Sequence, residues 1–161
     1  MISAIGNSER EVKITQAYFV PDRQLLKALT DAAGRGVKVQ LILPGRSDSE
    51  MTFHAGRSHY SALLEAGVRI YERKGALLHA KTVVIDGVWS SVGSSNLDWR
   101  SFLDNDEVNA VILGREFAAK MQAMFEKDLG SSDAIDLQSW ESRSPALRIR
   151  EWGARRLQRA L

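Results

Sequence analysis

The 161-residue sequence contains no cysteine, which excludes disulfide bonds and thiolate metal sites. It has only three histidines, His54, His59 and His79, and none stands at a metal-ligand spacing from another histidine or from carboxylates. No apolar run approaches the ~20 residues that a membrane-spanning helix needs, and no secretory signal is visible. We therefore expect a domain with no transmembrane segment, no metal and no other cofactor.

Charge and length set broad limits on the function. The formal net charge is +2 and the pI is about 9.0, which suits an anionic substrate but does not separate lipid from nucleic acid. A chain of 161 residues is long enough for one hydrophobic core. We expect one α/β catalytic domain over residues 1–143 and a C-terminal segment of different character over residues 144–161.

Strand and helix patterns alternate along the catalytic domain. Runs of β-branched and apolar residues predict strands at residues 11–19, 37–43, 68–71, 82–86, 88–93 and 107–113. Helical spacing predicts helices at residues 22–33, 47–66 and 115–129. Asp22 is the expected N-cap of the first helix, and a short later helix is expected with Asp133 or Asp136 as its cap. The alternation implies a mixed β-sheet flanked by helices on both faces.

The segment after Pro145 has the pattern of a basic amphipathic helix. Its apolar residues are Leu147, Ile149, Trp152, Leu157 and Leu161, and its basic residues are Arg148, Arg150, Arg155, Arg156 and Arg159. This pattern is typical of a helix that lies on an anionic membrane surface, and equally of a terminal helix docked on its own domain. The sequence leaves both interpretations open.

The residues most informative about function lie between His79 and Asn96. His79 and Lys81 are two residues apart at the start of a predicted buried strand, so their side chains should lie on the same face. Asp86 is an odd number of residues from both and should face away. We therefore expect Asp86 to orient or brace the site rather than to contact substrate. A surface His and Lys on a strand without chemistry is the simpler alternative.

Each residue type in this segment suits phosphate chemistry. A neutral imidazole at His79 is able to attack phosphorus and to carry the phosphoryl group covalently. Lys81 supplies a compact positive charge to the phosphate oxygens. Ser94 and Asn96 supply hydrogen-bond donors where charge accumulates in the transition state, and Gly93 permits close backbone approach.

The spacing H-x-K-x4-D-x6-G-S-x-N resembles the HKD motif of the phospholipase D superfamily, and it is matched by His79, Lys81, Asp86, Gly93, Ser94 and Asn96. In that superfamily an acidic residue further along the chain hydrogen-bonds the catalytic histidine, and Glu107 matches its position. A carboxylate there would fix the tautomer of the imidazole. The alternative is an ordinary solvated glutamate at the start of a strand.

The flanking segments extend the resemblance. AYFVPD, LILPGRSD and NDEVNAVI, with the motif segment between the last two, look like the C-terminal half of bacterial cardiolipin synthases, from about Ile5 to Trp140. The resemblance implies metal-free transfer of a phosphatidyl group from one phosphatidylglycerol to another through a phosphohistidine intermediate. It also implies a peripheral place at the cytoplasmic face of the bacterial inner membrane.

The number of motifs departs from that family pattern, because cardiolipin synthases carry two HKD motifs and this sequence carries one. The expected partner is a second motif-bearing domain, either a second copy of the chain or a missing N-terminal half. A homodimeric phosphodiesterase acting on nucleic acid and an inactive half-domain are the alternatives. Nucleic acid is the less favoured substrate, because the arginines cluster at the C-terminus and the aromatic residues read as core.

Overall fold

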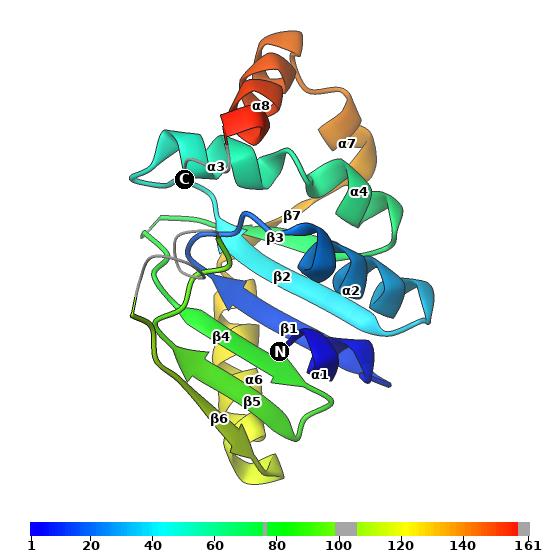
Figure 1. The fold of residues 1–161 in the computed structure, drawn as a ribbon, viewed down its shortest axis with the longest axis vertical. Helices are drawn as coiled ribbons and strands as arrows, with labels where there is room; N and C mark the ends of the chain where they lie inside the picture. The colour runs from blue at the N-terminus through cyan, green and yellow to red at the C-terminus, as the bar shows by residue number, and fades with distance from the viewer. Residues whose placement is uncertain (76, 99–105, 158–161) are drawn as a thin grey trace.

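The computed structural model describes residues 1–75, 77–98 and 106–157. Its centre is a seven-stranded mixed sheet of order β6-β5-β4-β1-β2-β3-β7 (Figure 1). The strands are β1 (Glu11–Gln16), β2 (Lys38–Pro44), β3 (Arg69–Arg73), β4 (Lys81–Ile85), β5 (Trp89–Gly93), β6 (Asn109–Leu113) and β7 (Ser132–Ile135). The neighbours β1, β2 and β3 are parallel, and the other neighbouring pairs are antiparallel.

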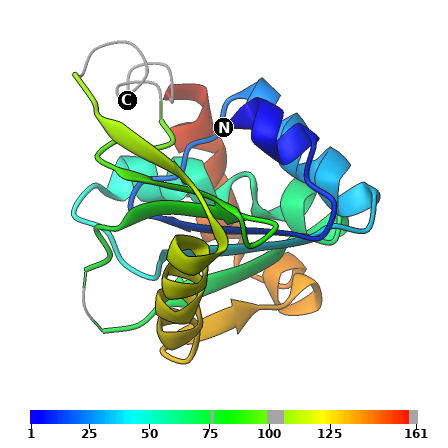
Figure 2. The ribbon, with the colours of Figure 1, turned by 90° about the horizontal axis from the view of Figure 1, so that it is seen from below.

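Helices cover both faces of the sheet, as predicted (Figure 2). The helices are α1 (Ile2–Gly6), α2 (Arg23–Gly34), α3 (Glu50–Arg57), α4 (Tyr60–Glu65), α6 (Arg115–Leu129), α7 (Leu137–Glu141) and α8 (Pro145–Leu157). Helix α6 packs on one face, and α1, α2 and α4 lie on the other. Helix α8 packs against α3 at the end of the molecule farthest from β6 (Figure 1).

The alternation of side chains along each strand divides the core into two layers. On the α2 side, Val12 and Ile14 of β1 pack with Leu25 and Leu29 of α2. On the α6 side, the ammonium group of Lys13 lies 5.9 Å from the ring centroid of Phe125. The central strands are therefore covered on both faces, which explains their nearly continuous apolar sequences.

One predicted helix is wrong, and one of the two expected caps of a later helix is confirmed. The helix expected over residues 47–66 is two helices, α3 and α4, separated at Ser58 and His59. The Ser58 hydroxyl donates to the carbonyl of Ala55 at 2.6 Å, a local bond that competes with helix continuation. The cap of α7 is Asp136, whose carboxylate accepts from the Ser139 backbone at 2.8 Å, whereas Asp133 lies in β7.

One helix cap was predicted correctly, and one short strand was not predicted. Asp22 caps α2 as expected, accepting from the Leu25 backbone N–H at 2.7 Å. The short strand β7, which pairs with β3, was not predicted, because four residues give too little alternation to be recognised. Among the described residues, no helix is long and apolar enough to cross a membrane.

The C-terminal segment is helical as predicted, and it is docked on the domain. Ala154 of α8 packs with Val20 and with Ala55 of α3. The buried carboxylate of Glu151 pairs with the guanidinium of Arg143 at 2.8 Å. Of the predicted helix, residues 158–161, including Arg159 and Leu161, lie outside the described residues.

Candidate active site

His79 and Lys81 are in direct contact, as their spacing predicted. The Lys81 ammonium nitrogen lies 3.0 Å from His79 Nδ1 and 3.2 Å from Nε2, and it donates to the His79 carbonyl oxygen at 3.0 Å. Lys81 is the first residue of β4 and is half-buried, while His79 is exposed. A solvent-accessible imidazole therefore stands beside a positive charge that the sheet holds in place.

The surroundings of Lys81 lower its pKa. Burial lowers the pKa of Lys81, while the carboxylates of Glu107 and Asp98 act in the opposite direction, and the net result is a pKa below 10.5. Glu107 thus belongs to the electrostatic environment of the motif. Its predicted hydrogen bond to His79 stays a prediction.

Tyr18 also adjoins the histidine, and Asp48 is bonded to Tyr18. The Tyr18 hydroxyl donates to the Asp48 carboxylate, and the Tyr18 ring meets the imidazole of His79 edge to face, with centroids 6.4 Å apart. This hydrogen bond, with burial and the charges of Asp48 and Asp98, raises the pKa of Tyr18 to about 12. Neither residue had a role predicted from its sequence pattern, although Tyr18 lies in AYFVPD and Asp48 in LILPGRSD.

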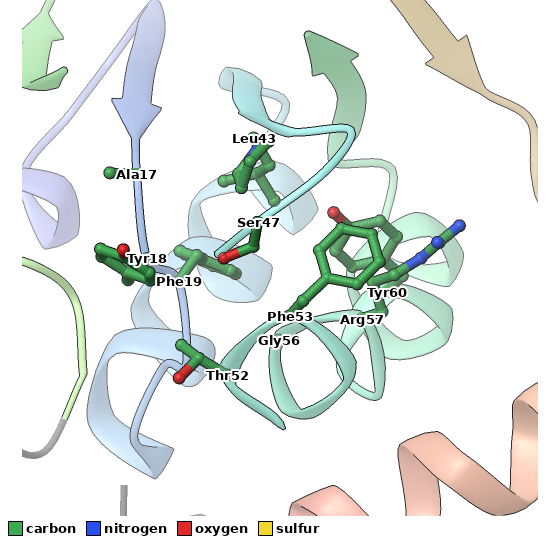
Figure 3. Close-up of a pocket in the computed structure, with 11 residues that line it drawn as sticks. Ala17, Tyr18, Phe19, Leu43, Ser47, Thr52, Phe53, Gly56, Arg57 and Tyr60 are labelled. Carbon is green, nitrogen blue, oxygen red and sulfur yellow. The ribbon is translucent and has the colours of Figure 1, made fainter. Parts of the chain in front are cut away.

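Tyr18 borders a small apolar cavity at the ends of β1 and β2 (Figure 3). The cavity has a volume of about 20 Å³ and is lined by residues that include Phe19, Leu43, Phe53 and Tyr60. Space of that size holds about one water molecule. It is too small for a substrate.

Asp86 braces the chain rather than the histidine. It adopts a left-handed backbone conformation with φ of 53°. Its carboxylate accepts backbone N–H groups from Glu9 at 3.0 Å, Arg10 at 2.8 Å and Glu11 at 3.0 Å. Partial burial raises the pKa of Asp86, but these bonds and the Arg10 guanidinium outweigh it, so the pKa lies below 3.8. The motif aspartate therefore anchors the segment that leads into β1.

Gly93 is the last residue of β5 and is paired with Asn109 of β6, and Ser94 follows it. A Cβ on Gly93 would lie 2.2 Å from both the Val108 carbonyl oxygen and Asn109 Oδ1, so only glycine fits. The Ser94 hydroxyl accepts from the Val108 backbone N–H at 3.0 Å and lies 3.4 Å from the Val108 carbonyl. Asn96 is half-buried in the following turn. The phosphate-binding roles of Ser94 and Asn96 stay predictions.

A second cavity, of about 140 Å³, adjoins Lys81, and its polar lining includes Gln16, Ser95 and Asn109. Gln16 donates to the Ser95 carbonyl at 3.1 Å, and the Asn109 amide donates to the Ser95 hydroxyl at 2.5 Å. Neither Gln16 nor Asn109 was predicted from the sequence. Only strand register reveals them, because Gln16 is paired with Lys81 and Asn109 with Gly93.

Metal ligands are not clustered in the described part of the chain, where no group of three or more His, Asp or Glu side chains is placed to hold an ion. The positive charge available at the motif comes from Lys81.

The fold is a mixed β-sheet flanked by helices, and a histidine and a lysine lie at the start of a central strand, beside a Gly-Ser turn. Together these features define a phospholipase D-like domain. The family model described as "Cardiolipin synthase, PLD-like domain" matches residues 1–129, and the chain belongs to this family.

The chain is similar to curated cardiolipin synthases over most of its own length. The cardiolipin synthase of Geobacillus sp. (strain WCH70) is 40% identical over 147 residues, covering 91% of this chain and 29% of the relative. Cardiolipin synthase A of Buchnera aphidicola subsp. Schizaphis graminum (strain Sg) is 40% identical over 151 residues, covering 94% and 31%. The chain thus spans less than a third of the length of these relatives.

Solved structures agree on the fold. Nuc from Salmonella typhimurium, a phospholipase D family member, has a TM-score of 0.72 at 20% identity, over 83% of this chain and 87% of that one. The phosphatidylserine synthase of Haemophilus influenzae Rd KW20 has a TM-score of 0.74 at 13% identity, over 99% of this chain and 44% of that one.

Proposed function

We propose that this domain supplies one half of the active site of a cardiolipin synthase-type phosphatidyltransferase. The substrate is phosphatidylglycerol or a closely related phospholipid. The observation that carries the proposal is the contact of His79 with Lys81 at 3.0 Å, in a chain whose curated relatives are cardiolipin synthases.

The proposed chemistry proceeds in two displacements at phosphorus. In the first, His79 attacks one phosphatidylglycerol, an N–P bond forms, and the P–O bond to glycerol breaks. In the second, a hydroxyl of another phosphatidylglycerol attacks, a new P–O bond forms, and His79 is released. Lys81, Ser94 and Asn96 stabilise the charge on the phosphate oxygens during both steps.

A proton donor must stand on the opposite side of the phosphate. In the first step the leaving glycerol needs a proton, and in the second step the attacking hydroxyl must lose one. A single acid–base group, distinct from His79, is able to serve both steps. His59 is buried beside α4, and the ring of His54 lies against Phe53, so neither is suitable. We assign this role to a second motif-bearing domain, in a homodimer or in another part of a longer chain.

Strand β6 is a candidate surface for such a domain. It is the terminal strand of the sheet and begins two residues after Glu107, and its side chains are largely exposed. Val108, just before the strand, is 77% exposed, and within the strand Val111 is 57% and Leu113 72% exposed. Apolar side chains at an uncovered sheet edge favour contact with another protein surface. The assembled enzyme would act as a peripheral protein at the cytoplasmic face of the bacterial inner membrane, where its lipid substrates lie.

The first test traps the intermediate. An active assembly is mixed with phosphatidylglycerol labelled in its phosphatidyl moiety and quenched in alkali, which preserves phosphohistidine. Wild-type protein should carry the label and His79→Asn should not. Label of equal yield on His79→Asn would show that another residue is the nucleophile. Lys38→Gln, an exposed change at the start of β2, is the control that should label normally.

The second test asks where the second half-site comes from. Wild type and His79→Ala are mixed in varying ratios and allowed to exchange subunits. If two copies share one site, activity falls with the square of the wild-type fraction. A linear fall would show that each chain works alone. Activity that appears only when a different motif-bearing domain is added would identify the partner as the other half of a longer enzyme.

A further inference from the structure

Helix α8 presents its apolar stripe to solvent. Its docked face is formed by Glu151 and Ala154, which are 3% and 8% exposed. The larger apolar side chains point elsewhere: Ile149 is 68% exposed, Trp152 61% and Leu157 56%. An amphipathic helix normally buries its large apolar residues against its own domain. Here Glu151 and Ala154 form the buried face and Leu147 is half-buried, so Ile149, Trp152 and Leu157 remain for an external contact.

The same exposed surface is strongly basic. Glu151, the one acidic residue of α8, is neutralised by Arg143 at 2.8 Å. Arg148, Arg150, Arg155 and Arg156 are exposed, and none of them appears among the ion pairs of the described residues. The guanidinium of Arg156 lies 4.7 Å from the ring centroid of Trp152. Aromatic and aliphatic side chains interleaved with arginine match the interface of an anionic bilayer, which is apolar inside and negative at the surface.

A polar cavity lies beside this surface. It has a volume of about 340 Å³, and its lining includes Trp152, Arg155 and Arg156 of α8 and Arg23 at the start of α2. The Asp22 carboxylate also lines it, but one of its oxygens already accepts the Leu25 backbone N–H at 2.7 Å. Three guanidinium groups around a cavity of this size suit the phosphate of a lipid headgroup.

We propose that α8 is a membrane-docking helix, whose face of Ile149, Trp152 and Leu157 enters the headgroup region of an anionic bilayer while its arginines bind lipid phosphates. Figure 1 places α8 and β6 at opposite ends of the molecule, so docking leaves the sheet edge free for a partner domain. Helix α3, on which α8 rests, begins two residues after Asp48, the partner of Tyr18 beside His79. The membrane-docking helix is thus connected through α3 to the residues that adjoin His79.

The test measures binding of the full chain to vesicles by co-sedimentation, and needs no catalytic activity. Vesicles contain either phosphatidylcholine alone or phosphatidylcholine with an equal part of phosphatidylglycerol. Wild type should prefer the anionic vesicles, and the preference should weaken as salt rises. Arg155→Gln with Arg156→Gln should weaken binding to them about twenty-five-fold, at about five-fold for each basic residue. Ile149→Ser with Trp152→Ser should weaken it at every salt concentration.

Matched controls lie on other surfaces. Met124→Ser removes a side chain on α6 that is 57% exposed, and Lys38→Gln removes an exposed charge on β2, so both should bind as wild type does. Thermal unfolding of each variant should be unchanged, because every substituted side chain is exposed. Equal binding to neutral and anionic vesicles, or wild-type binding by the α8 variants, would overturn the proposal. So would a dimer that the α8 variants convert to monomer without lipid, since the surface would then belong to a second copy.

Discussion

Replacement of Asp86 by asparagine should destabilise the domain without removing its chemistry. The Asp86 carboxylate binds three backbone N–H groups, two through Oδ1 and one, that of Glu9, through Oδ2. Asparagine keeps the first oxygen but turns an amide donor toward the Glu9 N–H. The substitution therefore changes two charge-assisted bonds into neutral ones and removes a third.

The size of the effect follows from those three bonds. A bond to a charged group contributes about 1.5–3 kcal/mol and a neutral one about 0.5–1.5 kcal/mol, so each retained bond weakens by about 1 kcal/mol. Because Glu9 is exposed, water is able to satisfy its N–H, which keeps the third loss small. We expect a loss of about 2 kcal/mol, or a fall in Tm of about 4–8 °C for a chain of this length. Asp86→Ala should lose more, because alanine must also adopt the left-handed conformation.

The effect should depend on pH in a defined direction. The folded-state pKa of Asp86 lies below the ordinary value of 3.8. Its stabilisation is therefore fully present above pH 3.8 and is lost as pH falls through the folded-state pKa. The difference in Tm between wild type and Asp86→Asn should be largest near neutral pH and should shrink as pH falls below about 4.

Thermal unfolding followed by circular dichroism measures this difference, with Asp22→Asn as the matched control. Asp22 undergoes the same chemical change at an N-cap, where asparagine is as good as aspartate, so its Tm should hold. Transfer activity of Asp86→Asn in an active assembly, measured well below its Tm, should stay within about three-fold of wild type, since 0.6 kcal/mol corresponds to about three-fold. An unchanged Tm with abolished activity would refute the bracing role and assign Asp86 to the reaction.

Other predictions concern the strand junction, the tyrosine beside His79 and metals. Gly93→Ala should lower the free energy of unfolding by about 2 kcal/mol or more, because its Cβ would meet the Val108 carbonyl at 2.2 Å. Gly153→Ala, with nothing within 4 Å of its Cβ, should instead raise it by about 0.5–1 kcal/mol. Chemical denaturation measures both changes. Tyr18→Phe should raise the pKa of the Asp48 carboxyl toward 3.8, because the Tyr18 hydrogen bond is the largest cause of its lowering; carboxyl ¹³C NMR titration would contradict this if the pKa held. Transfer activity of an assembled enzyme should survive a chelator, since Lys81 supplies the charge; activity lost to a chelator and restored by a divalent ion would show a metal-dependent site.

The sequence predicted those parts of the site that depend on local geometry. The contact of His79 with Lys81 follows from strand alternation, and the requirement for glycine at position 93 follows from close packing. Gln16 and Asn109 escaped prediction, because their place beside Lys81 depends on the pairing of strands far apart in the sequence. The function of Asp86 was only half predicted: it faces away from the histidine, but what it braces lies 75–77 residues earlier.

The fold was predictable where patterns are long. The helix α2 and the buried strands show clear periodicity, whereas the four residues of β7 do not. The face on which α8 docks was not predictable either. An amphipathic pattern indicates that one face is apolar, but the choice of Ala154 over Trp152 for the internal contact depends on the shape of α3.

The exposed edge of β6 limits how this domain is able to exist alone in a cell. Strand β6 pairs with β5 along one edge, and its other edge, at the end of the described sheet, is a template for pairing with any extended chain. During synthesis, such a strand needs its proper partner soon, or it recruits chaperones and proteases instead. The abundance of the domain in the cell should therefore follow that of its partner.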